Sequence, residues 1–169
     1  MPLDDFRRQI DAKAKVDLDM ISHCADRYRV SLIATVLRWL GYTEKRAVLV
    51  VSRDGFVLWA RSSTAAAKTG AFFRTSAGTI EIPAVSLPVR QDLQVDGRAC
   101  VDHDAGVWFR EPVREMTVFA EQYDFAISLL LLDDAPPFGS FDAEPEADTY
   151  DRMVPEEHRR GMVIRSRRR

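Results

Sequence analysis

The sequence predicts an α+β protein, in which an N-terminal helical segment with a helix-turn-helix precedes a small mixed sheet and a disordered tail. Apolar residues recur at helical spacing as far as Leu40. After Gly41 this pattern gives way to an apolar run at 47–51 that is rich in β-branched residues and typical of a buried strand. After Leu132 acidic residues and prolines become frequent. We therefore expect a helical segment at 1–43, a sheet domain at 44–132 and a tail at 133–169.

The first predicted helix runs from Pro2 to about Ala14 and is mostly polar. Its apolar residues Leu3, Phe6 and Ile10 recur at helical spacing and therefore share one face. We expect this face to be exposed in the isolated chain, as a surface on which a further domain would pack.

Two further helices form the predicted helix-turn-helix. Asp17 is expected to cap the first of them, because its carboxylate can accept a backbone N–H, and Ser31 is expected to cap the second. Gly41 ends the second helix, and residues 29–31 make a connection of ordinary length for this motif. The side chains expected to face the core are Leu18, Ile21, Ala25 and Tyr28, then Leu32 or Ile33, Val36, Leu37 and Leu40.

The sheet domain opens with the run 47–51, which predicts a central strand. Residues 52–55 predict a hairpin turn, because Gly55 can adopt the positive φ that such turns need, and 56–60 return as the partner strand. Serines 62 and 63 predict the start of a short capped helix.

The second half of this domain is less regular. Residues 83–88 are bounded by prolines and predict a loop, and the apolar element 107–109 could be helix or strand. The apolar stretches 113–120 and 126–132 predict an antiparallel pair of strands joined around 122–124.

No metal-binding constellation is evident. The His-Glu-x-x-His motif of zinc peptidases does not occur. A site assembled from His23, Cys24, Cys100 and His103 is disfavoured, because neighbouring helix positions diverge and residues three apart on a strand face opposite sides. We expect no zinc in this chain, and we interpret Cys24 as a small buried hydrophobe.

No catalytic centre is evident either. Asp102, His103 and Asp104 carry acid and base groups, but no nucleophile lies nearby in a recognisable turn, so we interpret them as an exposed acidic loop. The eight glycines show neither dinucleotide-binding nor phosphate-loop spacing. We therefore predict that the chain by itself catalyses no reaction.

The helix-turn-helix is not expected to recognise a DNA sequence. Its second helix begins with Leu32, Ile33, Ala34 and Thr35, which cannot form bidentate hydrogen bonds to base edges. We expect weak, salt-dependent DNA binding or none. A stand-alone helix-turn-helix transcriptional regulator is the alternative interpretation. The candidate phosphate contacts are Arg27, Arg29, Arg38, Lys45 and Arg46.

The tail has an unusual charge distribution. Residues 133–157 hold nine acids and four prolines, and the last eleven residues hold six arginines. This composition predicts disorder, with the arginines either solvated or folded back on the acids rather than bound to nucleic acid. The net charge of −2 predicts no global attraction to nucleic acid or membrane. With two cysteines and no apolar run long enough to span a bilayer, we expect a cytoplasmic protein.

Several of these segments together resemble the ImmA/IrrE family of zinc metallopeptidases. Residues 1–7 are similar to the Leu-Leu-Met-Pro segment that follows the family's catalytic helices. Val30-Ser31, Ala34, Arg38 and Leu40-Gly41 resemble its helix-turn-helix, and 50–55 with Trp59 resemble a hairpin found downstream. The resemblance covers about residues 1–132. Its fainter matches are Pro83, Ser86, Trp108, Glu115, Tyr123 and 129–132.

The resemblance implies a helix-turn-helix followed by a GAF-like sensor domain. The family's peptidase domain cleaves a helix-turn-helix repressor in stress or mobile-element regulation. Its zinc motif lies upstream of the Met-Pro segment, so no zinc-binding or catalytic residue has a counterpart here, and zinc is expected only if an upstream peptidase domain exists. Two origins stay open: a separate non-catalytic module, or the C-terminal part of a peptidase whose gene extends upstream of Met1.

The resemblance also implies the partners of the chain. They are a peptidase domain in cis or in trans, a helix-turn-helix repressor and a small-molecule ligand. In this reading the face formed by Leu3, Phe6 and Ile10 would pack against the peptidase domain.

Overall fold

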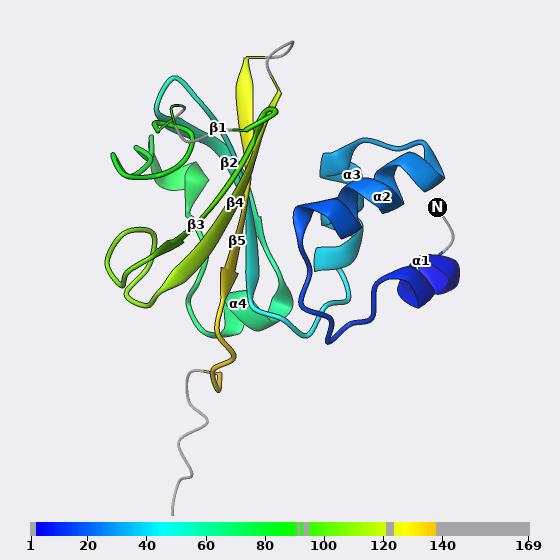
Figure 1. Ribbon diagram of the computed structural model, residues 1–169. Helices are drawn as coiled ribbons and strands as arrows, with labels where there is room; N and C mark the ends of the chain where they lie inside the picture. The colour runs from blue at the N-terminus through cyan, green and yellow to red at the C-terminus, as the bar shows by residue number, and fades with distance from the viewer. Residues whose placement is uncertain (1–2, 91, 93–94, 121–123, 138–169) are drawn as a thin grey trace, which may run out of the picture. The chain divides into compact units, whose positions relative to one another are not determined.

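The computed structural model describes residues 3–90, 92, 95–120 and 124–137. Helices α1 to α3 come first in the chain and gather on one side of an antiparallel sheet (Figure 1). The elements are α1 (Leu3–Gln9), α2 (Leu18–Tyr28), α3 (Leu32–Leu40), β1 (Ala47–Arg53), β2 (Phe56–Ser62), α4 (Thr64–Lys68), the 3₁₀ turn η1 (Thr75–Ala77), β3 (Arg98–His103), β4 (Val113–Ala120) and β5 (Phe125–Leu132). The α+β class is confirmed.

The helix caps lie where local chemistry predicts them. The carboxylate of Asp17 accepts the N–H of Met20 at 2.8 Å, and the hydroxyl of Ser31 accepts the N–H of Ala34 at 3.2 Å. Helix α1 is shorter than expected and ends at Gln9. A turn stops it, because the side chain of Asp11 accepts the N–H of Lys13.

The strands lie in the order β2-β1-β5-β4-β3. Every pairing between the described strands is antiparallel, whereas the sequence led us to expect a mixed sheet. The predicted central strand and its hairpin are confirmed: Asp54 and Gly55 both have positive φ, 52° and 82°, which matches the twist of a two-residue hairpin turn. The predicted pair β4 and β5 is also confirmed.

A strand at Cys100 and His103 was assumed only in the argument against a metal site, and the extent of β3, Arg98–His103, was not predicted. We expected residues 102–104 to form an exposed acidic loop, but Asp102 and His103 belong to this edge strand, and His103 is buried. Edge strands often carry polar residues on alternate positions, so the apolar pattern that reveals a central strand is absent.

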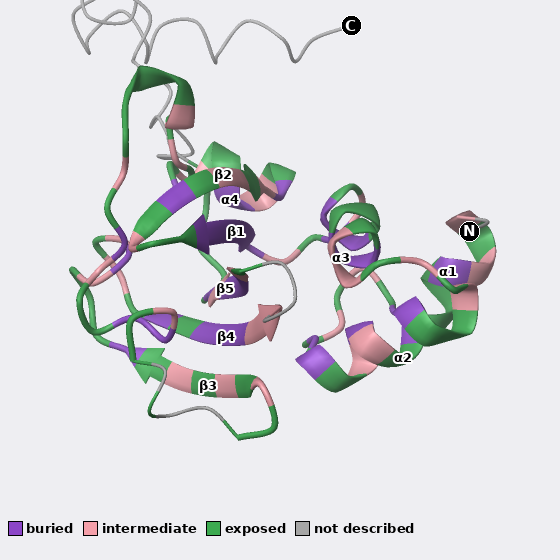
Figure 2. Ribbon diagram, turned by 90° about the horizontal axis from the view of Figure 1, so that it is seen from above, coloured by how far each residue is buried: buried purple, intermediate pink, exposed green. Residues whose placement is uncertain are grey.

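Each face of the sheet has its own hydrophobic core. Figure 2 shows that buried residues lie along β1, β4 and β5 and on α1 to α3. On the helical side, α1 to α3 pack on Leu49, Met116, Ile127 and Leu129. On the other side, α4 and the segments around Ile82 and Trp108 cover the remaining inward-facing residues of β1, β4 and β5; the strand residues of this second core are Val48, Val50, Val113, Leu130 and Leu132.

The helical segment and the sheet share the first of these cores and lie in one compact unit, Met1–Phe138. The boundary that we predicted after residue 43 therefore does not separate two hydrophobic cores. The disorder predicted for the tail falls almost wholly on residues 138–169, which lie outside the described residues.

The predicted exposed face of the first helix is wrong. Phe6 and Ile10 are 0% and 1% exposed, because they pack inside the chain's own helical core, and Leu3 is half-buried. Leu37 was expected in the core but is 39% exposed. Its place on the inner side of α3 is taken by Trp39, which is completely buried.

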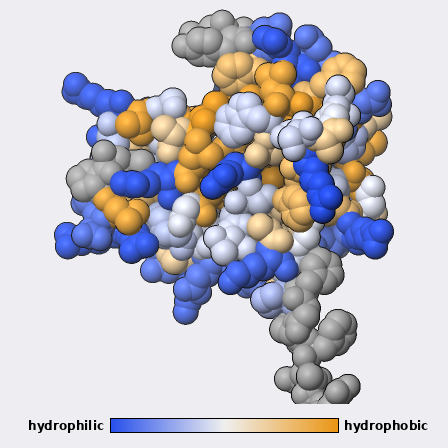
Figure 3. All heavy atoms as spheres, turned by 180° about the vertical axis from the view of Figure 1, so that it is seen from behind, coloured by the Kyte–Doolittle hydropathy of each residue, from blue (hydrophilic) through white to orange (hydrophobic). Residues whose placement is uncertain are grey.

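On the face seen in Figure 3, hydrophobic side chains gather in patches with charged side chains between them. In the part of the chain that the structure describes, no helix has the length and apolar character needed to cross a membrane.

Candidate functional site

A cleft of about 530 Å³ lies between the helical segment and one end of the sheet. Residues 14–17, which join α1 to α2, form one side together with Trp39 of α3. The ends of β1, β3, β4 and β5 form the other side. Small-molecule sites in proteins commonly have volumes of about 300–1,000 Å³, so the cleft is large enough for such a ligand.

Trp39 of α3 is among the residues that border the cleft. Its side chain is 0% exposed, and its Nε1–H has no hydrogen-bond partner among the described residues. A buried N–H without an acceptor costs about 1–3 kcal/mol, which makes such groups rare away from functional positions. The indole N–H is a donor only, so whatever satisfies it must supply an acceptor.

An ion pair between β3 and β4 borders the cleft. Arg114 donates to both carboxylate oxygens of Asp102, at 2.7 and 3.0 Å. These hydrogen bonds from the guanidinium lower the pKa of Asp102 below its ordinary value, and the charge of Lys15 contributes in the same direction. Both partners are exposed, so the pair shapes the rim of the cleft and adds little stability.

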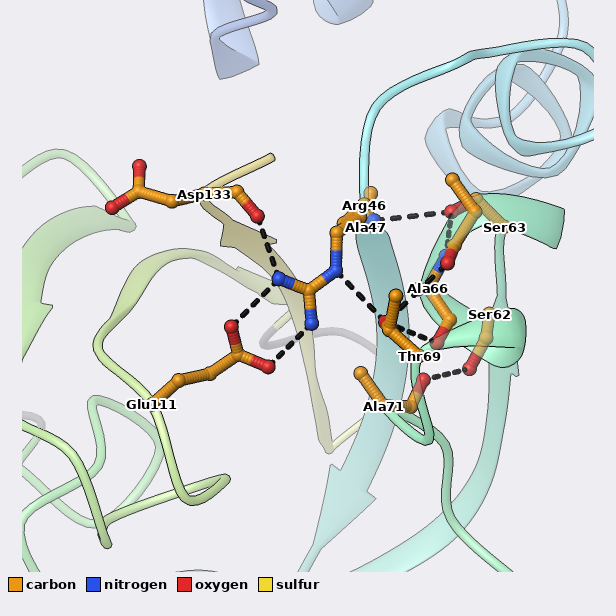
Figure 4. Close-up of polar contacts among 10 residues, drawn as sticks. Arg46, Ala47, Ser62, Ser63, Ala66, Thr69, Ala71, Glu111 and Asp133 are labelled. Atoms are coloured by element: carbon orange, nitrogen blue, oxygen red, sulfur yellow. Dashed lines mark hydrogen bonds and ion pairs between the residues drawn. The ribbon is translucent and has the colours of Figure 1, made fainter. Parts of the chain in front are cut away.

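Arg46 belongs to the lining of the cleft, and Figure 4 shows its polar contacts. Its guanidinium donates to both carboxylate oxygens of Glu111, to the carbonyl of Asp133 at 2.6 Å and to the hydroxyl of Thr69 at 2.8 Å. One side chain thus joins the end of α4, the segment before β4 and the segment after β5.

This arrangement corrects the prediction that Arg46 contacts phosphate. The side chain is 3% exposed and its donors are engaged inside the protein. A nucleic acid therefore cannot reach it without disrupting the fold.

The other predicted phosphate contacts lie at three different places. Arg27 stacks over the ring of Tyr28 and Arg29 caps the C-terminal end of α2, whereas Arg38 lies in the last turn of α3. Lys45 lies at the cleft and donates to Asp134 at 2.7 Å. Of the predicted phosphate contacts, Lys45 and Arg46 belong to the cleft lining, whereas Arg27, Arg29 and Arg38 do not.

The buried carboxylate of Glu115 accepts several hydrogen bonds on the face of the sheet that points away from α1 to α3. Glu115 is 0% exposed and lies on β4. Its Oε2 accepts the backbone N–H of Leu87 at 3.1 Å and the indole N–H of Trp108 at 3.2 Å, and it lies 2.7 Å from Nε2 of His103. Its Oε1 accepts the Ser128 hydroxyl at 3.1 Å.

This network holds the backbone of Leu87 and the indole of Trp108 against the sheet. The hydroxyls of Thr117 and Ser128, the nearest nucleophile candidates, are completely buried and hydrogen-bond to each other at 2.7 Å. Sequence reasoning missed the network. The one available signal was a glutamate in the inward register of a strand, two residues from Val113 and two from Thr117.

The described cysteines and histidines do not gather into one site. Among the described residues, no group of three or more His, Cys, Asp or Glu side chains is placed to hold a metal ion. Cys24 is buried in the helical core, as predicted, and its burial raises the thiol pKa. Cys100 and His103 face opposite sides of β3, also as predicted, because their cross-strand partners Met116 and Val113 belong to different cores.

No protein-family model matches the chain, and a search of curated proteins finds no significant match. The structural class is therefore defined by its own features. It is an α+β protein whose N-terminal helices and antiparallel sheet share a core and enclose a cleft.

Proposed function

We propose that this chain is a non-catalytic regulatory module that senses a small molecule in the cleft between its helical segment and its sheet. In this proposal it corresponds to the C-terminal part of an ImmA/IrrE-type zinc metallopeptidase, acting in the cytoplasm on a helix-turn-helix repressor in stress or mobile-element regulation. The sheet domain is the GAF-like sensor. Its partners are the repressor and a peptidase domain, in cis or in trans, and zinc belongs to that domain.

The observation that carries the sensing role is the composition of the cleft. Lys15, Val16 and Trp39 come from the helical segment, whereas Arg114 and Leu132 come from strands. A ligand in the cleft contacts both sets of residues at once, so its affinity depends on how the helices are placed on the sheet. By linkage, binding then favours one placement, which is the physical requirement for a sensor.

The helical segment supports a protein-contact role over DNA reading. Leu32 and Ile33 at the start of α3 are half-buried and pack against the core, so they cannot face base edges. Exposed residues of this helix include Leu37 and Arg38, an apolar and a charged side chain next to each other. Such a surface is typical of contacts between proteins.

A fragment screen followed by NMR tests the proposal. The uniformly ¹⁵N-labelled chain would be titrated with a library of neutral, anionic and cationic fragments. We expect at least one fragment to shift amide signals on both sides of the cleft, in 14–17 and in 113–114, together with the indole signal of Trp39.

Two variants, each replacing an alanine by phenylalanine, provide the test and its control. Ala14→Phe fills the cleft and should abolish these shifts, because Ala14 is part of the lining. Ala77→Phe, at an exposed position in η1, should leave them intact. A library in which no fragment perturbs the cleft, or in which Ala14→Phe has no effect, would refute the sensing role.

A further inference from the structure

A groove of about 500 Å³ lies between α1 and α3. Helix α1 contributes Leu3 and Arg7 to its lining, which are one helical turn apart. Helix α3 contributes Ala34, Leu37 and Arg38. No residue of this lining belongs to the lining of the cleft, so the groove is a separate surface of the helical segment.

Tyr42 gives the groove a wall of fixed shape. Its hydroxyl donates to the carbonyl of Ile10, and its ring meets the ring of Phe6 edge-on at 5.9 Å between centroids. The guanidinium of Arg7 lies over the same ring, 5.1 Å from its centroid. A surface that is ordered before a partner arrives loses little conformational entropy on binding.

The groove exposes apolar side chains on the outer face of α3. Leu37 is 39% exposed, Ala34 lies one turn before it and is also exposed, and Leu3 across the groove is half-buried. Helix α3 has nine residues and is therefore about 13 Å long. A groove of this kind between two helices accepts the apolar stripe of a third helix, over two to three turns.

The charge of the groove is positive. Within the described residues its lining holds the guanidinium groups of Arg7 and Arg38 and no carboxylate. The two carboxylates of α1, Asp4 and Asp5, lie outside this lining, and Asp5 accepts the hydroxyl of Tyr28. Because one arginine belongs to α1 and the other to α3, acidic residues on either side of a bound apolar stripe would each meet a cation.

The apolar side chains favour a protein over a nucleic acid as the occupant. Two arginines would supply only a small part of the phosphate contacts on which DNA affinity depends. A phosphate backbone also offers no apolar side chain to cover Leu37, whereas a helix with an apolar stripe does.

We infer that the groove between α1 and α3 is a docking site for an amphipathic helix of a partner protein, with acidic residues on both sides of its apolar stripe. This inference rests on the protein-contact role proposed for the helical segment, and it adds the site and the chemistry of the partner. It does not depend on the sensing role of the cleft.

A display selection on the full chain tests the chemistry of the partner. Two peptide libraries of about four helical turns would share one apolar stripe at helical spacing. Their flanking positions would carry glutamate in the acidic library and lysine in the basic library. We expect the acidic library to be enriched, and the best acidic peptide to shift amide signals of the ¹⁵N-labelled chain in 3–7 and 34–42.

Two pairs of variants test the site by fluorescence anisotropy with that peptide. Leu37→Ala should weaken binding about fivefold or more, because it removes apolar surface that the peptide covers. Leu58→Ala is its control, because Leu58 is 45% exposed and lies on β2 outside the groove. It should leave the affinity unchanged.

The second pair reverses a charge at neighbouring positions of α1. Arg7→Glu should weaken binding of the acidic peptide about threefold to tenfold, and less so at high salt. It should strengthen binding of the lysine counterpart, which a loss of folding would not do. Arg8→Glu makes the same change in net charge outside the groove lining and should alter both affinities by less than about twofold.

Each other outcome overturns a stated part of the inference. Equal or stronger enrichment of the basic library would overturn the charge of the partner. Acidic peptides that shift amides of the helical segment outside the groove would overturn the site and leave the protein-contact role standing. Displacement of the peptide by a DNA duplex at physiological salt would overturn the choice of a protein. If neither library is enriched, the docking site fails, while the sensing role of the cleft is tested separately by the fragments.

Discussion

The Nε2 atom of His103 on β3 lies 2.7 Å from Oε2 of Glu115 on β4, and both side chains are buried. The same carboxylate oxygen accepts the backbone N–H of Leu87, from a loop that precedes both strands. Glu115 therefore connects an edge strand, an inner strand and a covering loop through one carboxylate.

Replacing Glu115 should destabilise the protein strongly. Glu115→Ala leaves the N–H groups of Leu87 and Trp108 buried without an acceptor, and each such group costs about 1–3 kcal/mol. We expect the free energy of unfolding, measured by urea denaturation, to fall by at least about 3 kcal/mol. The control Asp102→Asn, in an exposed ion pair, should change it by less than about 1 kcal/mol. Equal effects of the two substitutions would contradict the structural role of Glu115.

Arg46 should behave as a structural residue and not as a nucleic-acid contact. Arg46→Ala removes a buried cation that holds Glu111 and Thr69, and loss of one partner of such a pair costs about 3–5 kcal/mol. Arg53→Ala, at an exposed position, is the control and should change stability by less than about 0.5 kcal/mol. Circular dichroism during chemical unfolding measures both effects; a fully stable Arg46→Ala protein would refute this assignment.

The helical core should be sensitive to truncation of Phe6. The side chain is completely buried and packs edge-on against Tyr28 and Tyr42. Phe6→Ala should lower the free energy of unfolding by about 3–5 kcal/mol. Leu37→Ala, on the exposed side of α3, should cost less than about 1.5 kcal/mol. A small effect at Phe6 would instead restore the earlier expectation of an exposed face.

The raised pKa of Tyr42 predicts that the protein loses stability at high pH. Its hydroxyl donates to the carbonyl of Ile10 at 2.5 Å, and burial raises its pKa to about 12 from an ordinary value of 10.0. Because the folded pKa is the higher one, the contribution is complete below pH 10 and disappears as the pH rises through about 12. Unfolding free energies measured across this range should fall more steeply for the unmodified chain than for Tyr42→Phe. Parallel curves would show that Tyr42 does not contribute.

DNA binding should be weak and should depend on salt. The exposed cations Arg27 and Arg38 can contact phosphates, and removing them by Arg27→Ala and Arg38→Ala should flatten the dependence of affinity on salt without changing any sequence preference. Gel-shift titrations at several salt concentrations measure this slope. Tight, sequence-selective binding at physiological salt would favour a stand-alone transcriptional regulator.

Local chemistry made much of the fold predictable. The side-chain oxygens of Asp17 and Ser31 each accept the backbone N–H of the residue three positions later and so cap their helices. Gly55 closes a hairpin between adjacent strands. These interactions join residues that are neighbours in the chain, so the sequence pattern contains all the information they need. The strongly apolar strands β1, β4 and β5 were predictable for the same reason, because their burial is recorded in their own composition.

The burial of charged side chains and the shape of the cleft were decided by the tertiary structure alone, because they depend on partners far apart in the chain. Arg46 is buried because Glu111 and Asp133 reach it from segments 65 and 87 residues away. Glu115 tolerates burial because Leu87 and Trp108 supply donors. The cleft and the unpaired N–H of Trp39 arise from the packing of helices on strand ends. The sequence determined which local elements form, since those are set by near neighbours. The burial of charge and the shape of the site were decided by long-range packing, which no local pattern encodes.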